Sequence, residues 1–600
     1  MSFNLKDILH PFTVWKNLTR EPVTVKDPLN DRPGAANYRG FHKNDLEKCI
    51  GCGTCEEICQ NGAIDMVPVE GVETKEGDSG LRPKIDYGRC CWCALCVDIC
   101  ATCSLTMSNS YTWVSDDPED FRFIPGTGDK PWYGSEEGYT KAADFQLNPP
   151  DRVKMEELSP GERDKSFIEI VKGYSKEQAL EEAERCVACG LCTASCPAHM
   201  GIPEYIKAIR EDDMEKGLRV LYQCNPLPEI CGRICTHKCE TVCALQHKGE
   251  AVSIRWLKRY IADQVPAEKY KEILGTDKLE WNGKKVAIVG AGPAGLATAH
   301  YLALLGYRCN IFEALPEAGG MMRYGIPEYR LPYPALDKDI DYIKSLGVEI
   351  QTGMHVDRDI TLEELKTNYD AVYISTGLHS GRSTGVPGTD HRHVFQAIEL
   401  LREVTKGGEI HVAESIVVIG GGNVAMDIGR TLARLQKRAF GKINIIITSL
   451  ETEDIMPADR EEIVEAREEG IEIRPGWGPR EIVIEDGKIR GLEVVRCVSV
   501  FDELGRFSPK FADEDSEFFK GAMVVEAIGQ GMDLSYIPES MSNDLQRDGR
   551  GRLEVSNDFQ TSLSWLFVGG DIIEGPDVIH AIANGHRAAI GIDKYLSTAV

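Results

Sequence analysis

The sequence predicts a multidomain protein built from one small α+β domain, one α-helical domain and two α/β domains, the second α/β domain being inserted in the first. Three observations predict this organisation. Four groups of cysteines occupy the first 250 residues, helical patterns dominate 166–280, and two units of strand, glycine-rich loop and helix follow residue 283. A chain of 600 residues also exceeds what a single hydrophobic core supports.

Changes in composition place the predicted boundaries. Residues 1–38 form a polar arm with scattered apolar residues, too short for a core of its own, which we expect to dock on a partner. The segments after it are the cysteine-rich α+β domain at 39–112, a linker or wrapping segment rich in Asp, Glu, Gly and Pro at 113–165, the helical domain at 166–280, the first α/β domain at 281–390 and 521–600, and the second α/β domain at 391–520.

Composition excludes several classes of protein. No apolar run approaches the roughly 20 residues of a membrane-spanning helix, and the first residues show no signal-peptide pattern, so we expect a cytoplasmic protein without a transmembrane segment. The formal net charge of -27 argues against nucleic-acid binding, which needs clustered basic residues. The same charge favours partner proteins that present basic patches.

The first two cysteine groups share a spacing of two, two and three intervening residues. Among 21 cysteines in a chain without a secretion signal, metal ligation is a better interpretation than disulfides. In two-cluster ferredoxins, the first three thiolates of such a run bind one [4Fe-4S] cluster and the fourth thiolate binds the other. The predicted ligands are Cys49, Cys52, Cys55 and Cys100 for one cluster, and Cys90, Cys93, Cys96 and Cys59 for the other.

The segment from about residue 10 to 115, with the stretches CIGCGTCEEIC and CCWCALCVDIC, resembles the two-cluster ferredoxin subunit of respiratory complex I and of related membrane hydrogenases. Such subunits pass electrons between larger proteins, so the resemblance implies a docking role for the arm. The sequence departs from the usual pattern at Gln60 and Ala101, which replace the proline after each fourth cysteine. We expect this change to alter loop geometry and to leave ligation intact.

The third and fourth cysteine groups, RCVACGLCTASCP and CNPLPEICGRICTHKCETVC, resemble the N-terminal domain shared by the glutamate synthase small subunit, dihydropyrimidine dehydrogenase and the large subunit of NADH-dependent ferredoxin:NADP oxidoreductase. The resemblance implies one cluster on Cys186, Cys189, Cys192 and Cys243, and another on Cys196, Cys235 and Cys239. The fourth ligand of the latter can be Gln or Glu in this family. The matching segment VSIRWLKRY has neither, so we choose Cys231, with Cys224 and His237 as alternatives.

The first glycine fingerprint, Gly290, Gly292 and Gly295, follows a strand and opens a helix, where a backbone can approach a pyrophosphate. Glu313 ends the next strand, where an acid can bind ribose hydroxyls. The stretch GAGPAGLATAHYLALLGYRCNIFEALPEAGGMMRYGIPEYRLP resembles the flavin-binding segment of the glutamate synthase-type family. That resemblance, which runs from about 166 to 600, implies FAD at this site, with Tyr324 and Asp571 beside it.

The second fingerprint, Gly420, Gly422 and Ala425, is expected to bind the nicotinamide nucleotide. Relatives that use NADPH commonly place two arginines after the following strand, whereas this sequence has Ser449, Leu450 and Glu451 there. A carboxylate repels a 2′-phosphate and accepts hydrogen bonds from a free 2′-hydroxyl, so we favour NAD(H) over NADP(H). Three cations could still reach a phosphate from the preceding helix: Arg434, Lys437 and Arg438. Two residues match the family's crossover between the nucleotide domains: Gly529 and Gln530.

These sites predict an FAD-dependent NAD(P)H:acceptor oxidoreductase subunit. A nicotinamide gives two electrons as hydride and a cluster takes one, so a flavin is needed between them. We expect electrons to pass between NADH, FAD and four [4Fe-4S] clusters to a catalytic redox subunit or a ferredoxin, in a hetero-oligomer, with no side chain acting as acid or base. The alternatives are an electron-bifurcating flavoprotein subunit, the glutamate synthase small subunit, and a relay subunit with a vestigial flavin site.

Overall fold

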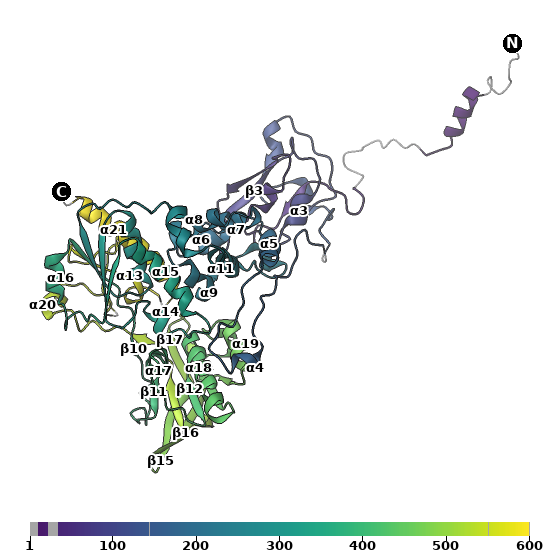
Figure 1. Ribbon diagram of the computed structural model, residues 1–600. Helices are drawn as coiled ribbons and strands as arrows, with labels where there is room; N and C mark the ends of the chain where they lie inside the picture. Colours follow the sequence, from purple (N-terminus) through teal and green to yellow (C-terminus); the bar gives the residue numbers. More distant parts are fainter. Residues whose placement is uncertain (1–9, 22–33, 143–144, 550, 576, 599–600) are drawn as a thin grey trace. The chain divides into compact units, whose positions relative to one another are not determined.

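The computed structural model describes residues 10–21, 34–142, 145–549, 551–575 and 577–598 (Figure 1). The chain divides into two compact units: unit one comprises Met1–Pro150 and Ala244–Glu250, and unit two comprises Asp151–Cys243 and Ala251–Val600. Most of the expected docking arm, 1–9 and 22–33, lies outside the described residues. The described part of the arm contains one 3-10 helix, η1 (His10–Asn17), with exposed side chains. No helix among the described residues is long and apolar enough to cross a membrane.

Unit one is a small α+β fold in which a short helix begins inside each cysteine run. Its elements are the antiparallel pair β1 (His42–Asn44) and β4 (Leu105–Met107), the sheet of β2 (Ile64–Pro68), β3 (Leu81–Asp86) and β5 (Arg122–Phe123), and the helices α2 (Thr54–Glu57) and α3 (Leu95–Ile99). A residue with positive φ precedes each helix, Gly53 at 74° and Ala94 at 69°. These turns fold each cysteine run back on itself.

The segment 113–165, for which we expected a linker or a wrapping segment, contributes packed residues to both units. Its first part contains η2 (Pro118–Phe121), β5 and η3 (Pro131–Gly134), and the buried ring of Trp132 stacks on Phe41 with 4.2 Å between centroids. Its last part forms α4 (Pro160–Arg163), where Arg163 pairs with Glu468 of unit two at 2.9 Å. Anchoring aromatic residues such as Trp132 account for this packing in a segment whose average composition is polar.

The first part of unit two is α-helical, as its sequence pattern predicts. The helices are α5 (Lys176–Glu184), α6 (Leu191–Ser195), α7 (Ile202–Arg210), α8 (Met214–Cys224), α9 (Pro228–Ile234), α10 (Lys238–Thr241), α11 (Ile254–Gln264), η5 (Ala267–Lys269) and α12 (Tyr270–Leu274). Between α10 and α11 the chain forms η4 (Ala244–His247), which belongs to unit one. Helices α9 and α11 pack closely at Gly232, where a Cβ atom would lie 2.8 Å from the Cα atom of Arg259. Glycine at this position therefore sets the distance between the two helices.

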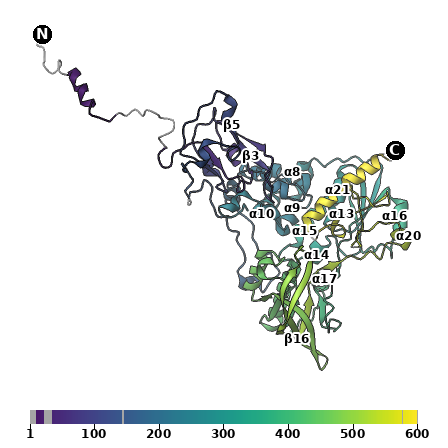
Figure 2. The same ribbon diagram turned by 180° about the vertical axis from the view of Figure 1, so that it is seen from behind.

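A parallel five-stranded sheet follows, with the order β20-β9-β6-β7-β8. Its strands are β6 (Lys285–Val289), β7 (Arg308–Glu313), β8 (Glu349–Thr352), β9 (Ala371–Ile374) and β20 (Leu566–Val568), and its helices are α13 (Pro293–Leu304), α14 (Met321–Tyr324), α15 (Tyr333–Ser345), α16 (Leu362–Asn368), α20 (Glu539–Ser542), η7 (Gly570–Ile572) and α21 (Val578–Thr598). Figure 2 shows α21 beside α13, and the Thr298 hydroxyl joins them by donating to the Gly585 carbonyl at 3.1 Å.

A second parallel sheet, of order β11-β18-β12-β13-β14, lies in the chain between β9 and β20. Its elements are β11 (Val394–Gln396), α17 (Ala397–Thr405), β12 (Ile416–Ile419), α18 (Asn423–Phe440), β13 (Ile445–Ser449), η6 (Glu453–Ile455), α19 (Arg460–Glu468), β14 (Glu472–Pro475) and β18 (Met523–Glu526). A separate antiparallel sheet follows β14 in the chain and consists of β15 (Trp477–Glu485), β16 (Lys488–Phe501) and β17 (Phe507–Lys520).

The return from the second sheet to the first comes later than expected. We placed it at residue 521, but β18 pairs with β12 and belongs to the second sheet. The two crossing segments then pair with each other as β10 (Ser380–Gly381) and β19 (Gln530–Gly531). The boundary was misplaced because a short buried run such as MVVE fits either parallel sheet equally well.

Candidate functional site

The first glycine loop joins β6 to α13 and cannot carry side chains at two of its positions. Gly290 has a φ of 102°, and a Cβ atom there would lie 2.6 Å from the Ser375 carbonyl oxygen. A Cβ atom at Gly295 would lie 2.0 Å from the Gly290 carbonyl oxygen. At Gly292, by contrast, no atom lies within 4 Å of the place where a Cβ atom would be. The loop is therefore packed against the sheet on one side and open at Gly292.

Glu313, at the end of β7, supports this loop. Its Oε2 atom accepts a hydrogen bond from the Ala291 N–H at 2.8 Å, and its Oε1 atom accepts one from Leu315 at 2.8 Å. Burial raises the pKa of the carboxyl group. Because a carboxylate oxygen has more than one acceptor position, these bonds leave room for the ribose hydroxyls that we expected Glu313 to bind.

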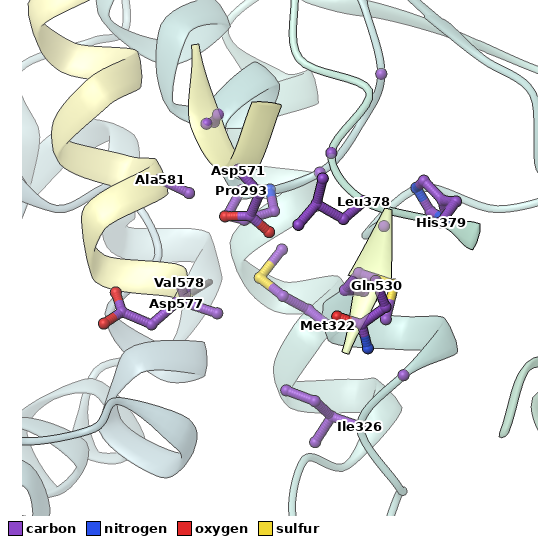
Figure 3. A pocket seen from close by; sticks show the side chains of 18 of the residues that line it. Pro293, Met322, Ile326, Leu378, His379, Gln530, Asp571, Asp577, Val578 and Ala581 are labelled. Atoms are coloured by element: carbon purple, nitrogen blue, oxygen red, sulfur yellow. The ribbon is translucent and has the colours of Figure 1, made fainter. Parts of the chain in front are cut away.

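A cavity lies in front of the loop, and Figure 3 shows Asp571, Pro293, Met322 and Gln530 around it. Burial, and then the negative charge of Asp577, raise the pKa of Asp571 to about 7. The Oδ1 atom of Asp571 is buried and has no hydrogen-bond partner among the described residues. A buried acceptor beside an open glycine loop fits a nucleotide that carries hydroxyl donors, as FAD does.

The structure differs from expectation at Tyr324, which does not line this cavity. Its hydroxyl group accepts a hydrogen bond from the Glu317 N–H at 3.0 Å, and its side chain is buried. The neighbouring residues Met322 and Ile326 line the cavity instead. Residues two apart in a helical turn point in different directions, so the sequence match located the segment and not the side chain.

The helical part of unit two forms one wall of the same cavity. Ile234 and Thr236, which flank Cys235 in the chain, line it together with Gly290 and Asp571. The Oγ1 atom of Thr236 is buried and has no hydrogen-bond partner among the described residues. The loop that carries one predicted cluster ligand therefore borders the predicted flavin site.

The cysteines of unit one lie near one another across the two runs. Burial is the main cause of the raised pKa of Cys55, and the next causes are the charges of Cys52, Cys96, Cys100 and Cys49. Burial is also the main cause of the raised pKa of Cys96, followed by the charges of Cys90, Cys93 and Cys59. Cys100 thus neighbours the first run and Cys59 the second. This is the arrangement that an exchange of fourth ligands between two clusters requires.

The cysteines of unit two form two further neighbourhoods. Burial is the main cause of the raised pKa of Cys192, followed by the charges of Cys189, Cys186 and Cys243. Burial is also the main cause of the raised pKa of Cys239, where Cys235, Glu240 and Cys196 raise the pKa further and Lys258 lowers it. Cys231 is fully buried and its pKa is raised by burial and by Cys235. Of the alternatives, Cys224 neighbours Cys196, while the Nδ1 atom of His237 lies 3.2 Å from the Cys235 carbonyl oxygen.

No group of three or more His, Cys, Asp or Glu side chains in the described ranges converges on a single metal ion. A cubane cluster does not need such convergence, because its four thiolates bind four separate irons. The donor set at each neighbourhood is thiolate, which is the ligand type of iron–sulfur clusters.

The second glycine loop joins β12 to α18. Gly420 has a φ of 148°, and a Cβ atom there would lie 2.3 Å from the Ala527 carbonyl oxygen. Gly422 faces open space, and the N–H of Ala425 donates to its carbonyl oxygen at 2.9 Å. The Glu451 carboxylate lies beside the loop, since its Oε2 atom would be 2.8 Å from a Cβ atom at Gly421.

Two of the three cations that could have reached a coenzyme phosphate are held elsewhere. Arg434 is buried, pairs with Glu469 at 2.7 Å, and has its guanidinium carbon 3.8 Å from the centre of the Tyr329 ring. Lys437 pairs with Asp164 at 3.3 Å. Of the two predicted crossover residues, Gln530 is in β19 and borders the cavity in front of the first glycine loop, and Gly529 precedes it with a φ of 104°.

Sequence reasoning missed two polar residues beside the cysteines. His42 lies in β1 with its Nε2 atom 3.3 Å from the Cys96 Sγ atom. Lys258 lies in α11 near four cysteines of unit two, namely Cys196, Cys231, Cys235 and Cys239. Neither residue belongs to a spacing pattern, so their roles depend on contacts that the sequence alone does not show.

Three segments match known protein families. The description "pyridine nucleotide-disulphide oxidoreductase" covers residues 284–588, "dihydropyrimidine dehydrogenase domain II, 4Fe-4S cluster" covers 163–270, and "4Fe-4S binding domain" covers 42–65. The first of these covers just over half of the chain.

Three curated relatives are similar over longer stretches. The beta subunit of the NADP(+)-dependent formate dehydrogenase of Moorella thermoacetica is 37% identical over 68% of this chain and 60% of that protein. The glutamate synthase [NADPH] small chain of Halomonas elongata is 33% identical over 76% of this chain and 98% of that protein. The oxidoreductase AegA of Escherichia coli is 30% identical over 92% of this chain and 86% of that protein. The chain thus matches less than two thirds of the formate dehydrogenase subunit.

Proposed function

Because this chain belongs to the pyridine nucleotide-disulphide oxidoreductases, among relatives of the glutamate synthase small chain, we propose that it moves electrons between NADH, FAD and four [4Fe-4S] clusters. The family makes it an NAD(P)H-dependent flavin and iron–sulfur oxidoreductase. The preference for NADH, the number of clusters and the redox partner are the substance of the proposal.

One observation carries the proposal. The cavity lined by Gly290 and Asp571 is also lined by Ile234 and Thr236, on either side of Cys235. When FAD is bound, it supplies the exchange between hydride transfer and single-electron transfer. The protein's part is to hold the nucleotide on the Gly290 loop and to bring the Cys235 loop to the same cavity, so that a cluster there is the first acceptor.

The residues around the second glycine loop support NADH. The Glu451 carboxylate lies beside Gly421, where it would repel a 2′-phosphate. Arg434 and Lys437 already pair with Glu469 and Asp164. The relatives above are named for NADP(+) or NADPH, so the coenzyme is the point at which our proposal departs from them.

The test is anaerobic mixing of the purified protein with NADH or with NADPH, followed by the flavin absorbance. We expect rapid bleaching with NADH and slow bleaching with NADPH. Equal rates, or faster bleaching with NADPH, would reject the proposed preference for NADH but would not contradict the proposed flavin site. No bleaching with either nucleotide would reject the oxidoreductase proposal itself.

We also propose that the electrons leave through unit one to a partner protein. The formate dehydrogenase relative is named as a subunit, and the glutamate synthase relative as a small chain. The alignment with that small chain covers nearly all of it but only 76% of this chain, so about a quarter of this chain lies outside that alignment. Affinity capture of the tagged full chain should retain a redox protein, and deletion of residues 1–38 should release it. Retention of the partner after this deletion would contradict the docking role.

A further inference from the structure

Helix α11 carries three cationic residues with different surroundings. Arg255 pairs with Glu461 at 2.6 Å, and Arg259 pairs with Glu169 at 2.9 Å. Lys258 is only 4% exposed, and within the described part of the chain its ammonium group makes no ion pair with a carboxylate. A buried lysine is rare unless another source of negative charge lies close to it.

The ionisable groups that act on Lys258 are cysteine side chains. They are Cys235, Cys231, Cys239 and Cys196, the four residues that we assign to the fourth cluster. When these cysteines hold a cluster as thiolates, their negative charge balances the positive charge of the buried lysine.

The packing of the helices independently places Lys258 at this site. At Gly232, next to Cys231, the backbone of α9 touches α11 at Arg259. One turn earlier, the Nη1 atom of Arg255 lies 3.5 Å from the carbonyl oxygen of Cys235. Lys258 is three residues after Arg255, and residues three apart lie on the same face of a helix, so Lys258 lies on the side of α11 from which Arg255 reaches the Cys235 loop.

We propose that Lys258 is the charge-compensating residue of the fourth [4Fe-4S] cluster and that its ammonium group raises the midpoint potential of that cluster. The inference rests on the proposed function, because it requires a cluster on these cysteines. A cluster on four thiolates is anionic and gains one more negative charge with each electron, so a fixed positive charge stabilises its reduced form.

This role has a consequence for electron flow. The Cys235 loop borders the flavin cavity through Ile234 and Thr236. A raised potential at this cluster favours transfer of the first electron away from the flavin. Lys258 thereby makes the first step of the relay favourable without touching the flavin or the nicotinamide.

The test compares variants of the full-length holoprotein by redox titration monitored by electron paramagnetic resonance. Cys239→Ser identifies the signal of this cluster by its change or loss. Lys258→Met removes the charge and keeps a long side chain, and Lys258→Arg keeps the charge. Lys238→Met is the matched control, because Lys238 is exposed and adjacent to Cys239.

We expect Lys258→Met to lower the ratio of reduced to oxidised cluster at a fixed potential at least about tenfold, which is about 59 mV for one electron. Lys258→Arg and Lys238→Met should stay near the wild type. Loss of this cluster's iron in Lys258→Met alone also supports the proposal, because the site then needs the charge in order to fill.

An unchanged potential in an iron-replete Lys258→Met variant overturns the inference and leaves the proposed relay intact. Loss of iron in both Lys258 variants also overturns it, since shape and not charge would then matter. Absence of the Cys239-dependent signal in the wild type is a different failure, because it rejects the fourth cluster of the proposed function and, with it, the role of Lys258.

Discussion

The Nε2 atom of His42 lies 3.3 Å from the Sγ atom of Cys96, and its Nδ1 atom lies 3.2 Å from the hydroxyl oxygen of Tyr87. Burial lowers the pKa of His42 to about 4, so the ring is neutral at pH 7. If Nδ1 accepts the Tyr87 hydrogen, then Nε2–H donates to the thiolate. This assignment gives the second cluster site of unit one a hydrogen bond from a neutral donor.

The His42 contact predicts a change in cluster potential. A hydrogen bond to a ligating sulfur stabilises the reduced cluster, so His42→Leu should lower the midpoint potential of the cluster on Cys90, Cys93, Cys96 and Cys59. We expect at least about a threefold change in the ratio of reduced to oxidised cluster, or about 30 mV. Redox titration of the variant measures it, with exposed His10→Leu as the control. An unchanged potential in a variant that retains its iron would show that the contact has no electronic role.

Two glycine substitutions should separate folding from flavin binding. Gly295→Ala places a Cβ atom 2.0 Å from the Gly290 carbonyl oxygen, so we expect this variant to lose both thermal stability and bound flavin. Gly292→Ala meets no atom within 4 Å, so the fold should persist while the added methyl group obstructs the pyrophosphate. Melting temperature and bound flavin are measured for both. A Gly292→Ala variant that keeps full flavin content would contradict the assigned position of the pyrophosphate.

A buried histidine predicts acid sensitivity of unit two. Burial, and then the charge of His586, lower the pKa of His300 to about 3, and neither ring nitrogen has a partner among the described residues. In the unfolded chain the pKa returns to about 6.5. Protons therefore bind the unfolded state first as pH falls from 6.5 towards 3, and the folded state loses stability over that window.

The variant His300→Phe removes this titration. Below pH 6.5 it should gain stability relative to the wild type by about 1.4 kcal/mol per pH unit, up to roughly 5 kcal/mol near pH 3. Melting temperatures between pH 7.5 and 5.5 measure the difference, and the exposed His411→Phe serves as control. Parallel curves for wild type and His300→Phe would show that His300 does not cause the acid sensitivity.

Coenzyme choice should follow the charge at Glu451. Glu451→Arg replaces a repulsive carboxylate with a cation beside the second glycine loop, so the ratio of kcat/KM for NADPH to that for NADH should rise at least about tenfold. Asp454→Arg, an exposed position three residues further on, controls for overall charge. If both substitutions change the ratio equally, local contact with the 2′-position is not the cause.

The sequence predicts those sites of this protein that are defined by the spacing of nearby residues. Cysteine runs and glycine loops are local patterns, so the candidate ligands from Cys49 to Cys243 and the candidate loop residues from Gly290 to Ala425 could be proposed before any fold was known. Contacts between segments that are distant in the sequence could not be predicted in this way. The run at 523–526 fits either parallel sheet, and Trp132 stands alone in a polar segment. Tyr324, His42 and Lys258 depend on which way one side chain points, which sequence spacing does not specify.

The most direct test of the account is an anaerobic titration of the holoprotein with NADH, followed by optical and paramagnetic resonance spectra. If one flavin and four clusters form one relay, full reduction should consume about three equivalents, since the flavin takes two electrons and each cluster takes one. Reduction that stops after about one equivalent, with the flavin bleached and every cluster still oxidised, would contradict electron transfer from the flavin to the clusters.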